Sequence, residues 1–330
     1  MVRVSLEHLH ELITRALVRA GTDPSIAQTV ADALIAAEGD GLRSHGLGRV
    51  KSYAGQVVSG KVDGKAEPEL SEPAGAVIKV DAKSGFAYPA IKLGLDRASE
   101  LVKENGVACV SVGNSHHSGA FGYHVERMAE RGLFTLAFSN SPAGIAPWGG
   151  KTPLFGTNPV AFGCPRRDHL PFVVDLSLAK VARGKIKMAA DKGESIPEGW
   201  AVDAAGNPTT DAKAAMQGSN IPLGDAKGYA LVLVVEILSA VLTGSNFGWE
   251  ATSFFTVDGP PPHVGQLFIV FDAKKFAIAG FEDRIDLLFS TILEQSGTRL
   301  PGERRLRIRE DNKRYGVEVD DQLMAFLKTI

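Results

Sequence analysis

A histidine and an arginine stand four positions apart in the stretch Ser44-His45-Gly46-Leu47-Gly48-Arg49. If residues 45–49 are helical, the two side chains share one helix face. His45 would then offer a titratable proton beside the planar guanidinium of Arg49, which suits a carboxylate, and Ser44 would orient the imidazole. A solvated turn that joins two helices is the alternative interpretation.

A second stretch, residues 113–120 with the sequence GNSHHSGA, joins a predicted strand to a predicted helix. Such a turn places free backbone N–H groups and a helix N-terminus at one point, which favours a bound phosphate. A metal site formed by His116, His117 and His124 is a rival, but adjacent histidines on a rigid element chelate one ion poorly. We therefore predict no metal, and a plain loop stays open as an alternative.

Three further features carry weaker signals. The Gly- and Pro-rich run 140–159 predicts tight turns that approach a ligand closely. Asp175, at the end of an apolar run, would hold a ribose hydroxyl or cap a helix. Lys227 stands at the start of an apolar helix, where a cation is unfavourable unless an anion is bound. Neither G-x-G-x-x-G after a strand nor a P-loop motif occurs, so a dinucleotide would have to bind without those fingerprints.

The elements that position these residues are predicted from periodicity. Helical spacing indicates helices over 5–20, 23–40, 51–60, 89–104, 120–131, 282–296, 303–314 and 320–329. Short apolar runs indicate strands over 76–81, 107–112, 133–138, 159–164, 171–176 and 266–272. The stretch 228–243 is apolar almost all round and predicts a buried central helix. The polar stretches 61–74, 191–225 and 257–264 predict loops.

The middle of the chain is therefore α/β, and both ends are helical. We expect residues 1–74 and 300–330 to pack together as one helical domain, and residues 75–299 to form the α/β domain that carries the cofactor and the chemistry. A length of 330 residues is typical of about two domains.

Composition excludes several classes of protein. The net charge of −2 argues against a nucleic-acid partner, and the basic run 304–309, interleaved with Glu303 and Glu310, predicts a solvated helix face. Cys109 and Cys164, the only cysteines, lie in strand-like runs and are predicted to be buried free thiols. No signal-peptide core or membrane span is evident, so we expect a cytoplasmic protein.

Together these stretches resemble the type-2 malate/L-lactate dehydrogenase family over essentially the whole chain. The resemblance is carried by SHGLGR (44–49), GNSHHSGAFGYH (113–124), FGTNPVAFGCP (155–165), VVDLSLAKVARGK (173–185), IPLGDAKGYAL (221–231) and LTGSNFG (242–248). It implies an α/β, non-Rossmann dinucleotide-binding fold (malate/sulfolactate dehydrogenase-like), with a helical domain formed from both chain ends, in a homodimer.

The resemblance also implies roles for individual residues. His45 looks like the catalytic proton donor or acceptor, with Ser44 as its partner and Lys185 nearby in the relay. Arg49 would bind the substrate carboxylate, with Thr157, Arg183 and Gly184 as further substrate contacts. The dinucleotide, NADPH or NADH with NADPH favoured, would be held by His117, Ser118, Gly119, Ala120, Phe121, Val174, Asp175, Leu176, Ser177, Ala226, Lys227, Arg299, Gly302 and Arg304.

Within the family the chain looks most like the cyclic-imine reductases, on SGKVDGKAEP (59–68), VDAKSGFAYPA (80–90), SHHSGAF (115–121) and VGQLFIVFDA (264–273). This implies reduction of Δ1-pyrroline-2-carboxylate or Δ1-piperideine-2-carboxylate to L-proline or L-pipecolate. Lys185 departs from the pattern of the piperideine-2-carboxylate reductases, which have an Asp there. Malate or L-lactate dehydrogenase is the alternative, because Lys185 would pair with the second carboxylate of malate. A non-catalytic dinucleotide-binding protein is the alternative of another class, and the intact Ser44, His45 and Arg49 set argues against it.

Overall fold

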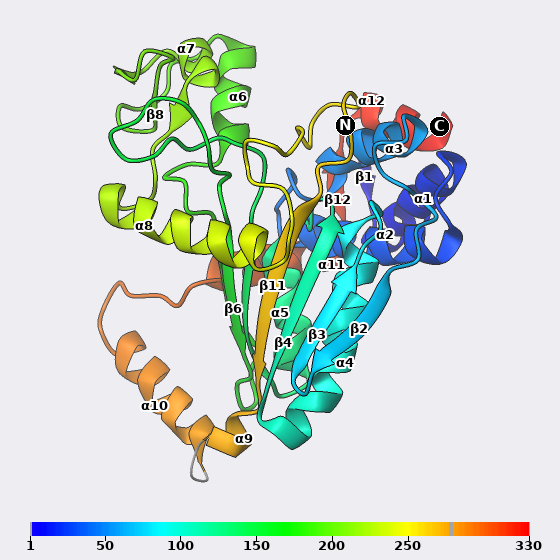
Figure 1. Cartoon of the computed structure of the whole chain (residues 1–330), viewed down its shortest axis with the longest axis vertical. Coiled ribbons are helices and arrows are strands. Elements are labelled where there is room, and N and C mark those ends of the chain that lie inside the picture. Colours follow the sequence, from blue (N-terminus) through cyan, green and yellow to red (C-terminus); the bar gives the residue numbers. More distant parts are fainter. Residues whose placement is uncertain (1, 277–279, 330) are drawn as a thin grey trace.

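The computed structural model describes residues 2–276 and 280–329. Its centre is a seven-stranded mixed sheet with the strand order β2-β3-β4-β11-β5-β6-β7 (Figure 1). These strands are β2 (Glu69–Ala74), β3 (Val77–Asp81), β4 (Val107–Ser115), β11 (Val264–Phe271), β5 (Phe134–Ser139), β6 (Val160–Cys164) and β7 (Phe172–Leu176). β3 and β4 are parallel, and the other neighbouring pairs are antiparallel. The chain thus has an α/β fold, as predicted.

Two helices cover one face of this sheet, α4 (Ala87–Asn105) and α5 (Phe121–Glu130). Alternate residues of β4, namely Ala108, Val110 and Val112, are buried, because successive strand side chains point to opposite faces. Gly94 lets α4 approach the sheet, since a Cβ there would collide with Val110. Of the two free cysteines, Cys164 on β6 is buried, but Cys109 on β4 is only half-buried.

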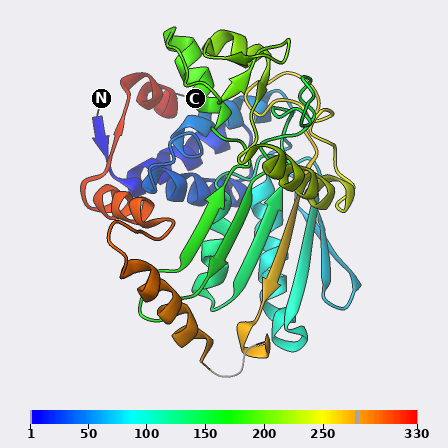
Figure 2. The same ribbon diagram turned by 90° about the vertical axis from the view of Figure 1, so that its left-hand side faces the viewer.

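The two chain ends lie side by side (Figure 2). β1 (Val2–Val4) pairs with β12 (Val317–Val319), and one apolar core joins α1 (Leu6–Arg19), α2 (Pro24–Gly39), α3 (Val50–Val58) and α12 (Asp321–Thr329). Asp23 caps α2 by accepting a 2.8 Å hydrogen bond from the Ser25 N–H. Apolar residues at helical spacing on α1 face this core, which is why the local pattern located these helices closely.

Two stretches predicted to be loops contain short ordered elements. Residues 69–74 form the edge strand β2, and residues 191–225 contain α7 (Ala212–Gln217) and the small sheet of β10 (Ser219–Asn220), β8 (Ala201–Val202) and β9 (Pro208–Thr209). Together with α6 (Arg183–Lys192) they enclose a small core around Ile186 and Ile196. The loop prediction was wrong because these short elements contain too few apolar residues to show a period.

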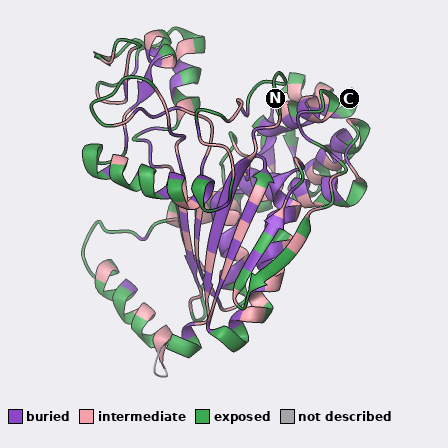
Figure 3. Ribbon diagram, in the orientation of Figure 1, coloured by how far each residue is buried: buried purple, intermediate pink, exposed green. Residues whose placement is uncertain are grey.

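The helix predicted over 228–243 is present, but the prediction that it is buried was wrong. α8 (Asp225–Glu236) continues into the π-helical turn η2 (Ile237–Val241), and Figure 3 shows an exposed side along α8. Val232 and Val235 face the core, but a line of apolar side chains is exposed: Leu231, Val234, Ile237, Val241 and Leu242. An all-round apolar pattern does not reveal which side is covered, and tertiary packing leaves this side open within one chain.

The C-terminal helices correct one more prediction. After α9 (Ala273–Phe276) and α10 (Phe281–Leu293), α11 (Glu303–Tyr315) packs on α2. Arg305 and Arg309 on α11 form ion pairs with Asp40 and Glu126, so the face they occupy is not simply solvated. In the described part of the chain, no helix has the length and apolar character needed to cross a membrane.

Candidate active site

His45 and Arg49 are brought together by a tight turn rather than by a common helix face. α2 ends at Gly39, and a 3-10 turn, η1 (Leu47–Arg49), leads into α3, so His45 lies outside any helix. The Arg49 Nε donates a 2.8 Å hydrogen bond to the Ser44 carbonyl, and the Ser44 Oγ lies 3.0 Å from His45 Nδ1. The predicted juxtaposition is present, and the predicted helical geometry is not.

A buried carboxylate fastens this turn. Glu38, on the last turn of α2, accepts a 2.9 Å hydrogen bond from the Leu47 N–H. Gly46 is required beside it, because a Cβ there would collide with the Glu38 carboxylate. Burial raises the pKa of Glu38. The turn that carries His45 therefore has an internal support that the sequence did not reveal.

His45 is a neutral imidazole in this environment. It is half-buried, and its ring stacks on that of His117 with 5.6 Å between centroids. Burial, and then the positive charge of Arg49, lowers the pKa of His45 to about 4. At pH 7 it is therefore poised to accept a proton, and an anion beside Arg49 would make it easier to protonate.

Two tyrosines complete the cluster, and sequence reasoning missed both. The Tyr53 hydroxyl lies 2.5 Å from His117 Nδ1 and 3.0 Å from the Tyr88 hydroxyl. Burial raises the pKa of Tyr53 to about 12, so its hydroxyl stays protonated. Tyr53 lies four residues beyond Arg49 along α3, and this spacing is the one signal that would have found it.

Within the described part of the chain, Arg49 is a buried cation without an acidic partner. Only 6% of the residue is exposed, and its guanidinium carbon lies 4.6 Å from the centre of the Phe255 ring. One terminal nitrogen, Nη1, has no hydrogen-bond partner among the described residues. An unpaired buried charge is costly in a folded protein. This arrangement is typical of a site that binds an anion.

The predicted cofactor residues at 117–121 lead into α5. The Ser118 carbonyl lies 3.0 Å from His124 Nε2, and Gly119, at φ +71°, packs against Tyr88 so closely that a Cβ would collide. Ala120 precedes Phe121, the first residue of α5. His117 and His124 face different partners, and no cluster of three metal-binding side chains occurs within 2–276 and 280–329.

Asp175 caps α5 from the end of β7. Its Oδ2 accepts a 2.7 Å hydrogen bond from the Gly122 N–H, so the capping contact is present, and the contact with a ribose hydroxyl stays a prediction. Its neighbours Val174, Leu176 and Ser177 follow the same strand edge. This edge therefore lies beside the 117–121 turn.

Backbone contacts place Thr157 and the start of α8 next to that strand edge. The Thr157 carbonyl accepts from the Leu178 N–H at 2.8 Å and from the Ser177 Oγ at 3.4 Å. The Leu223 N–H donates to the Leu178 carbonyl at 2.8 Å. Ala226 and Lys227 are exposed in the first turn of α8, and the Lys227 side chain has no partner among the described residues.

The remaining predicted residues lie on two other segments. Gly302 lies beside β7, because a Cβ on this residue would be 3.3 Å from the Val173 carbonyl oxygen. Arg299 and Arg304, on either side of Gly302 in the sequence, are exposed. Arg183 donates to Asn220 Oδ1 at 3.2 Å and to the Met216 carbonyl at 2.8 Å. Gly184 and Lys185 are exposed on α6, and no hydrogen bond of the described chain joins Lys185 to Ser44 or His45.

A buried glutamate organises the loops around Thr157. Glu236 on α8 accepts hydrogen bonds from Asn158 Nδ2 and the Gly248 N–H, both at 2.8 Å, and from Asn140 Nδ2 at 3.3 Å. Burial raises its pKa. A lone acid inside an apolar helical run was the available signal for this residue.

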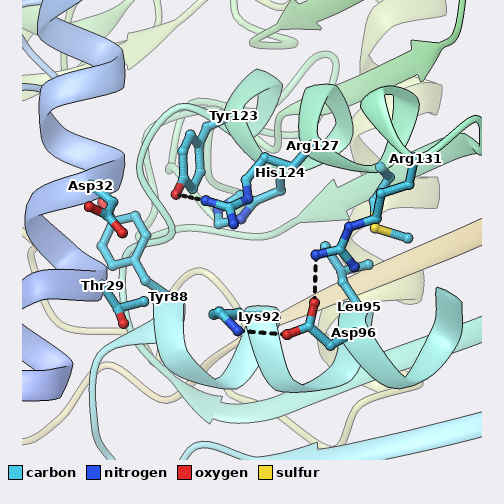
Figure 4. Close-up of a pocket in the computed structure, with 11 residues that line it drawn as sticks. Thr29, Asp32, Tyr88, Lys92, Leu95, Asp96, Tyr123, His124, Arg127 and Arg131 are labelled. Atoms are coloured by element: carbon cyan, nitrogen blue, oxygen red, sulfur yellow. Dashed lines mark hydrogen bonds and ion pairs between the residues drawn. The ribbon is translucent and has the colours of Figure 1, made fainter.

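A separate small pocket lies between α2, α4 and α5 (Figure 4). Its charged groups are already paired, since Asp96 binds Lys92 and Arg131, and Arg127 donates to the Tyr123 hydroxyl at 2.7 Å. The pocket thus offers no unpartnered charge comparable with that of Arg49.

Comparison with known proteins agrees with the predicted resemblance. The malate/L-lactate dehydrogenase family model matches residues 4–328. The chain is 51% identical to (2R)-3-sulfolactate dehydrogenase (NADP(+)) of Chromohalobacter salexigens, over 93% of this chain and 92% of that one. It is 40% identical to Δ1-pyrroline-2-carboxylate/Δ1-piperideine-2-carboxylate reductase of Pseudomonas aeruginosa, over 98% and 97%. The crystal structure of Δ1-piperideine-2-carboxylate reductase from Pseudomonas syringae superposes with a TM-score of 0.94, at 37% identity and 99% coverage of both chains.

The chain therefore belongs to the malate/L-lactate dehydrogenase family. As its members are dehydrogenases and reductases, the protein is an oxidoreductase. This confirms the predicted family and class.

Proposed function

We propose that this protein is an NAD(P)H-dependent reductase of a small 2-imino or 2-oxo carboxylate. Its substrates would be Δ1-pyrroline-2-carboxylate and Δ1-piperideine-2-carboxylate, reduced to L-proline and L-pipecolate. The observation that carries the proposal is the unpaired Arg49 guanidinium beside a neutral His45. The named reductases at about 40% identity support this choice of substrates.

The chain's own residues would act as follows. Arg49 pairs with the substrate carboxylate through Nη1, which is buried and has no partner among the described residues, and this fixes C2 of the substrate near His45. Once the carboxylate offsets the charge of Arg49, His45 can take up a proton. For a ketone it then supplies this proton to the carbonyl oxygen, while for a cyclic imine it sets the protonation state of the nitrogen. Ser44 orients the imidazole from Nδ1. Lys185, at the start of α6, is proposed as the third member of the relay, and it would have to reach His45 through the substrate because no hydrogen bond of the described chain joins the two.

The residues proposed for the cofactor suit a dinucleotide. Lys227 and Arg304 are exposed cations without an acidic partner in the described chain, and both lie next to helix N-termini, which favour phosphates. When bound, the nicotinamide supplies the hydride. NADPH is favoured because a 51% identical relative is named for NADP(+). The proposed fold is the non-Rossmann one of this family, with the helical domain of 1–74 and 300–330 beside 75–299.

The proposal includes a cytoplasmic homodimer. The exposed apolar line on α8 and η2, Leu231 to Leu242, is what supports a second copy. Sedimentation equilibrium would measure the mass in solution.

The test of function is a steady-state panel of pyrroline-2-carboxylate, piperideine-2-carboxylate, pyruvate, oxaloacetate and 2,3-diketogulonate with each cofactor. We expect the two imines to have the highest kcat/KM, and no turnover on any of them would contradict the proposal. His45→Ala should lower turnover of ketone substrates by about 10²–10⁴-fold while cofactor fluorescence still reports binding. Near-normal turnover would exclude the role of His45.

A second candidate is oxidation of a 2-hydroxy acid, either malate or L-lactate, or the sulfonated analogue named for the 51% identical relative. The exposed Lys185 would meet the second anionic group of malate or sulfolactate, whereas L-lactate has no such group. Adding malate, lactate and sulfolactate with oxidised cofactor distinguishes the two candidates.

A further inference from the structure

Residues 253–258 lie over the His45–Arg49 cluster through two consecutive aromatic rings. The Phe254 ring is 4.9 Å from that of His117 and 5.4 Å from that of His116, between centroids. Phe255 covers one face of the Arg49 guanidinium, and Phe255 itself is exposed to solvent over 57% of its surface. An exposed ring over a buried cation forms a wall beside any anion that binds there.

Three side chains at and after the end of α3 fasten this segment by its backbone carbonyls. Gln56 Nε2 donates hydrogen bonds to Phe254 O (3.2 Å) and Thr256 O (2.9 Å). Ser59 Oγ donates to Val257 O (2.9 Å). Lys61 Nζ donates to Ser253 O (2.7 Å), Thr256 O (3.2 Å) and Asp258 O (2.8 Å). Lys61 is 1% exposed. A buried ammonium that directs all three protons to one segment is an anchor, because any shift of that segment leaves a charge unsatisfied.

We propose that Phe255 is a specificity-determining residue of the carboxylate site, and that Lys61 is a positioning residue that holds it over Arg49. The inference rests on the proposed function. With one face of the guanidinium covered by Phe255, a carboxylate would pair with the buried and unpartnered Nη1, and the substituent on C2 would run along the phenyl ring. A ring or alkyl chain gains apolar contact there, whereas a methyl group gains little.

The first test compares Phe255→Ala and Phe255→Leu with wild type on Δ1-pyrroline-2-carboxylate and pyruvate. Phe255→Ala should lower the ratio of the two kcat/KM values about tenfold, and Phe255→Leu by less, because leucine keeps most of the apolar contact. Phe276→Ala, an exposed phenylalanine on α9, is the matched control and should leave the ratio unchanged. Equal losses on both substrates would overturn the inference.

The second test asks whether Lys61 acts through Phe255. Lys61→Met should shift the same ratio in the same direction, with an unchanged cofactor Kd, and Lys61→Arg should restore part of it. In the double variant Lys61→Met/Phe255→Ala the kcat/KM ratio should change no more than in Phe255→Ala alone, because both substitutions remove the same contact between Phe255 and the substrate. A lower melting temperature with an unchanged ratio would show a merely structural role and would overturn the assignment.

A binding measurement separates this inference from the proposed function. Calorimetry would compare pyrrole-2-carboxylate, a ring acid that cannot be reduced here, with acetate. Phe255→Ala should weaken pyrrole-2-carboxylate about tenfold and acetate hardly at all. If this holds while the wild type turns over no substrate, the inference stands and the function fails. If both acids lose equally, or neither binds to wild type, the inference fails whatever the turnover.

Discussion

Arg305 and Arg309 form one charged group and Arg49 forms another, and the two differ in how their charge is balanced. Arg49 is buried, whereas Arg305 and Arg309 are half-buried against the buried carboxylates of Asp40 and Glu126. Arg309 forms hydrogen bonds with both Asp40 (2.5 Å) and Glu126 (2.7 Å), and Arg305 lies 3.0 Å from each carboxylate. Arg49 has one backbone carbonyl, an aromatic ring and an unpaired nitrogen. The first group is paired within the chain, whereas Arg49 has no acidic partner among the described residues, and we propose that an anion from outside balances it.

This difference teaches how to distinguish a structural from a functional buried charge. The paired cluster joins the end of α2, the middle of α5 and α11, so it ties the turn of His45 to the helix that follows the predicted cofactor loop. Breaking such a pair leaves a buried charge, while removing a charge that has no partner leaves none. Stability and affinity should therefore respond oppositely in the two groups.

The largest effect on stability is expected for Arg309→Met. The change leaves Asp40 and Glu126 with only Arg305, and we expect a loss of about 3–5 kcal/mol of unfolding free energy. Urea unfolding followed by circular dichroism measures it, with the exposed Arg307→Met on the same helix as control. If both variants unfold alike, the paired cluster is not structural.

Arg49→Met should give the opposite result. We expect no loss of unfolding free energy, because an unpaired buried charge is removed, but a loss of about 2–5 kcal/mol in binding of the substrate carboxylate. Urea unfolding and the apparent KM measure the two effects. Arg49→Lys keeps the charge but loses the planar fork, and should raise KM by less. If Arg49→Met lowers the free energy of unfolding and leaves KM unchanged, Arg49 is a structural residue like Arg309 and does not bind the substrate carboxylate.

The smallest expected effect is on the pH dependence of stability. The pKa of His116 is lowered to about 3, first by burial and then by the charges of Lys61 and Arg49. Below pH 6.5 His116 binds a proton in the unfolded chain but not in the folded chain. The free energy of unfolding therefore decreases as the pH falls from 7 toward the folded-state pKa of about 3. For one such histidine the loss at pH 5 is about 2 kcal/mol.

The measurement is urea unfolding at pH 7 and pH 5. His116→Gln should reduce the difference between the two pH values, and the exposed His169→Gln should leave it unchanged. If wild type, His116→Gln and His169→Gln all show the same pH dependence, burial does not lower the pKa of His116 in the folded protein.

Local pattern was enough for most of the helices and strands of the large sheet, because apolar spacing repeats within a few residues. It failed where an element was too short to show a period, as in β8 and β9. It also failed where apolar residues lie all round a helix, as in α8, because the pattern then does not indicate which side is buried. The same limit applied to Arg305 and Arg309, whose partners lie more than 170 positions away in the sequence.

The sequence by itself determined the family, the α/β class and the presence of Ser44, His45 and Arg49 in one short stretch. Neighbours in sequence are neighbours in space, so their proximity needed no fold. Only the tertiary structure decided that His117 stacks on His45, that Tyr53 binds His117, and that Phe255 covers Arg49. Those contacts join residues 64 to 206 positions apart, and only packing of the whole chain determines such distances.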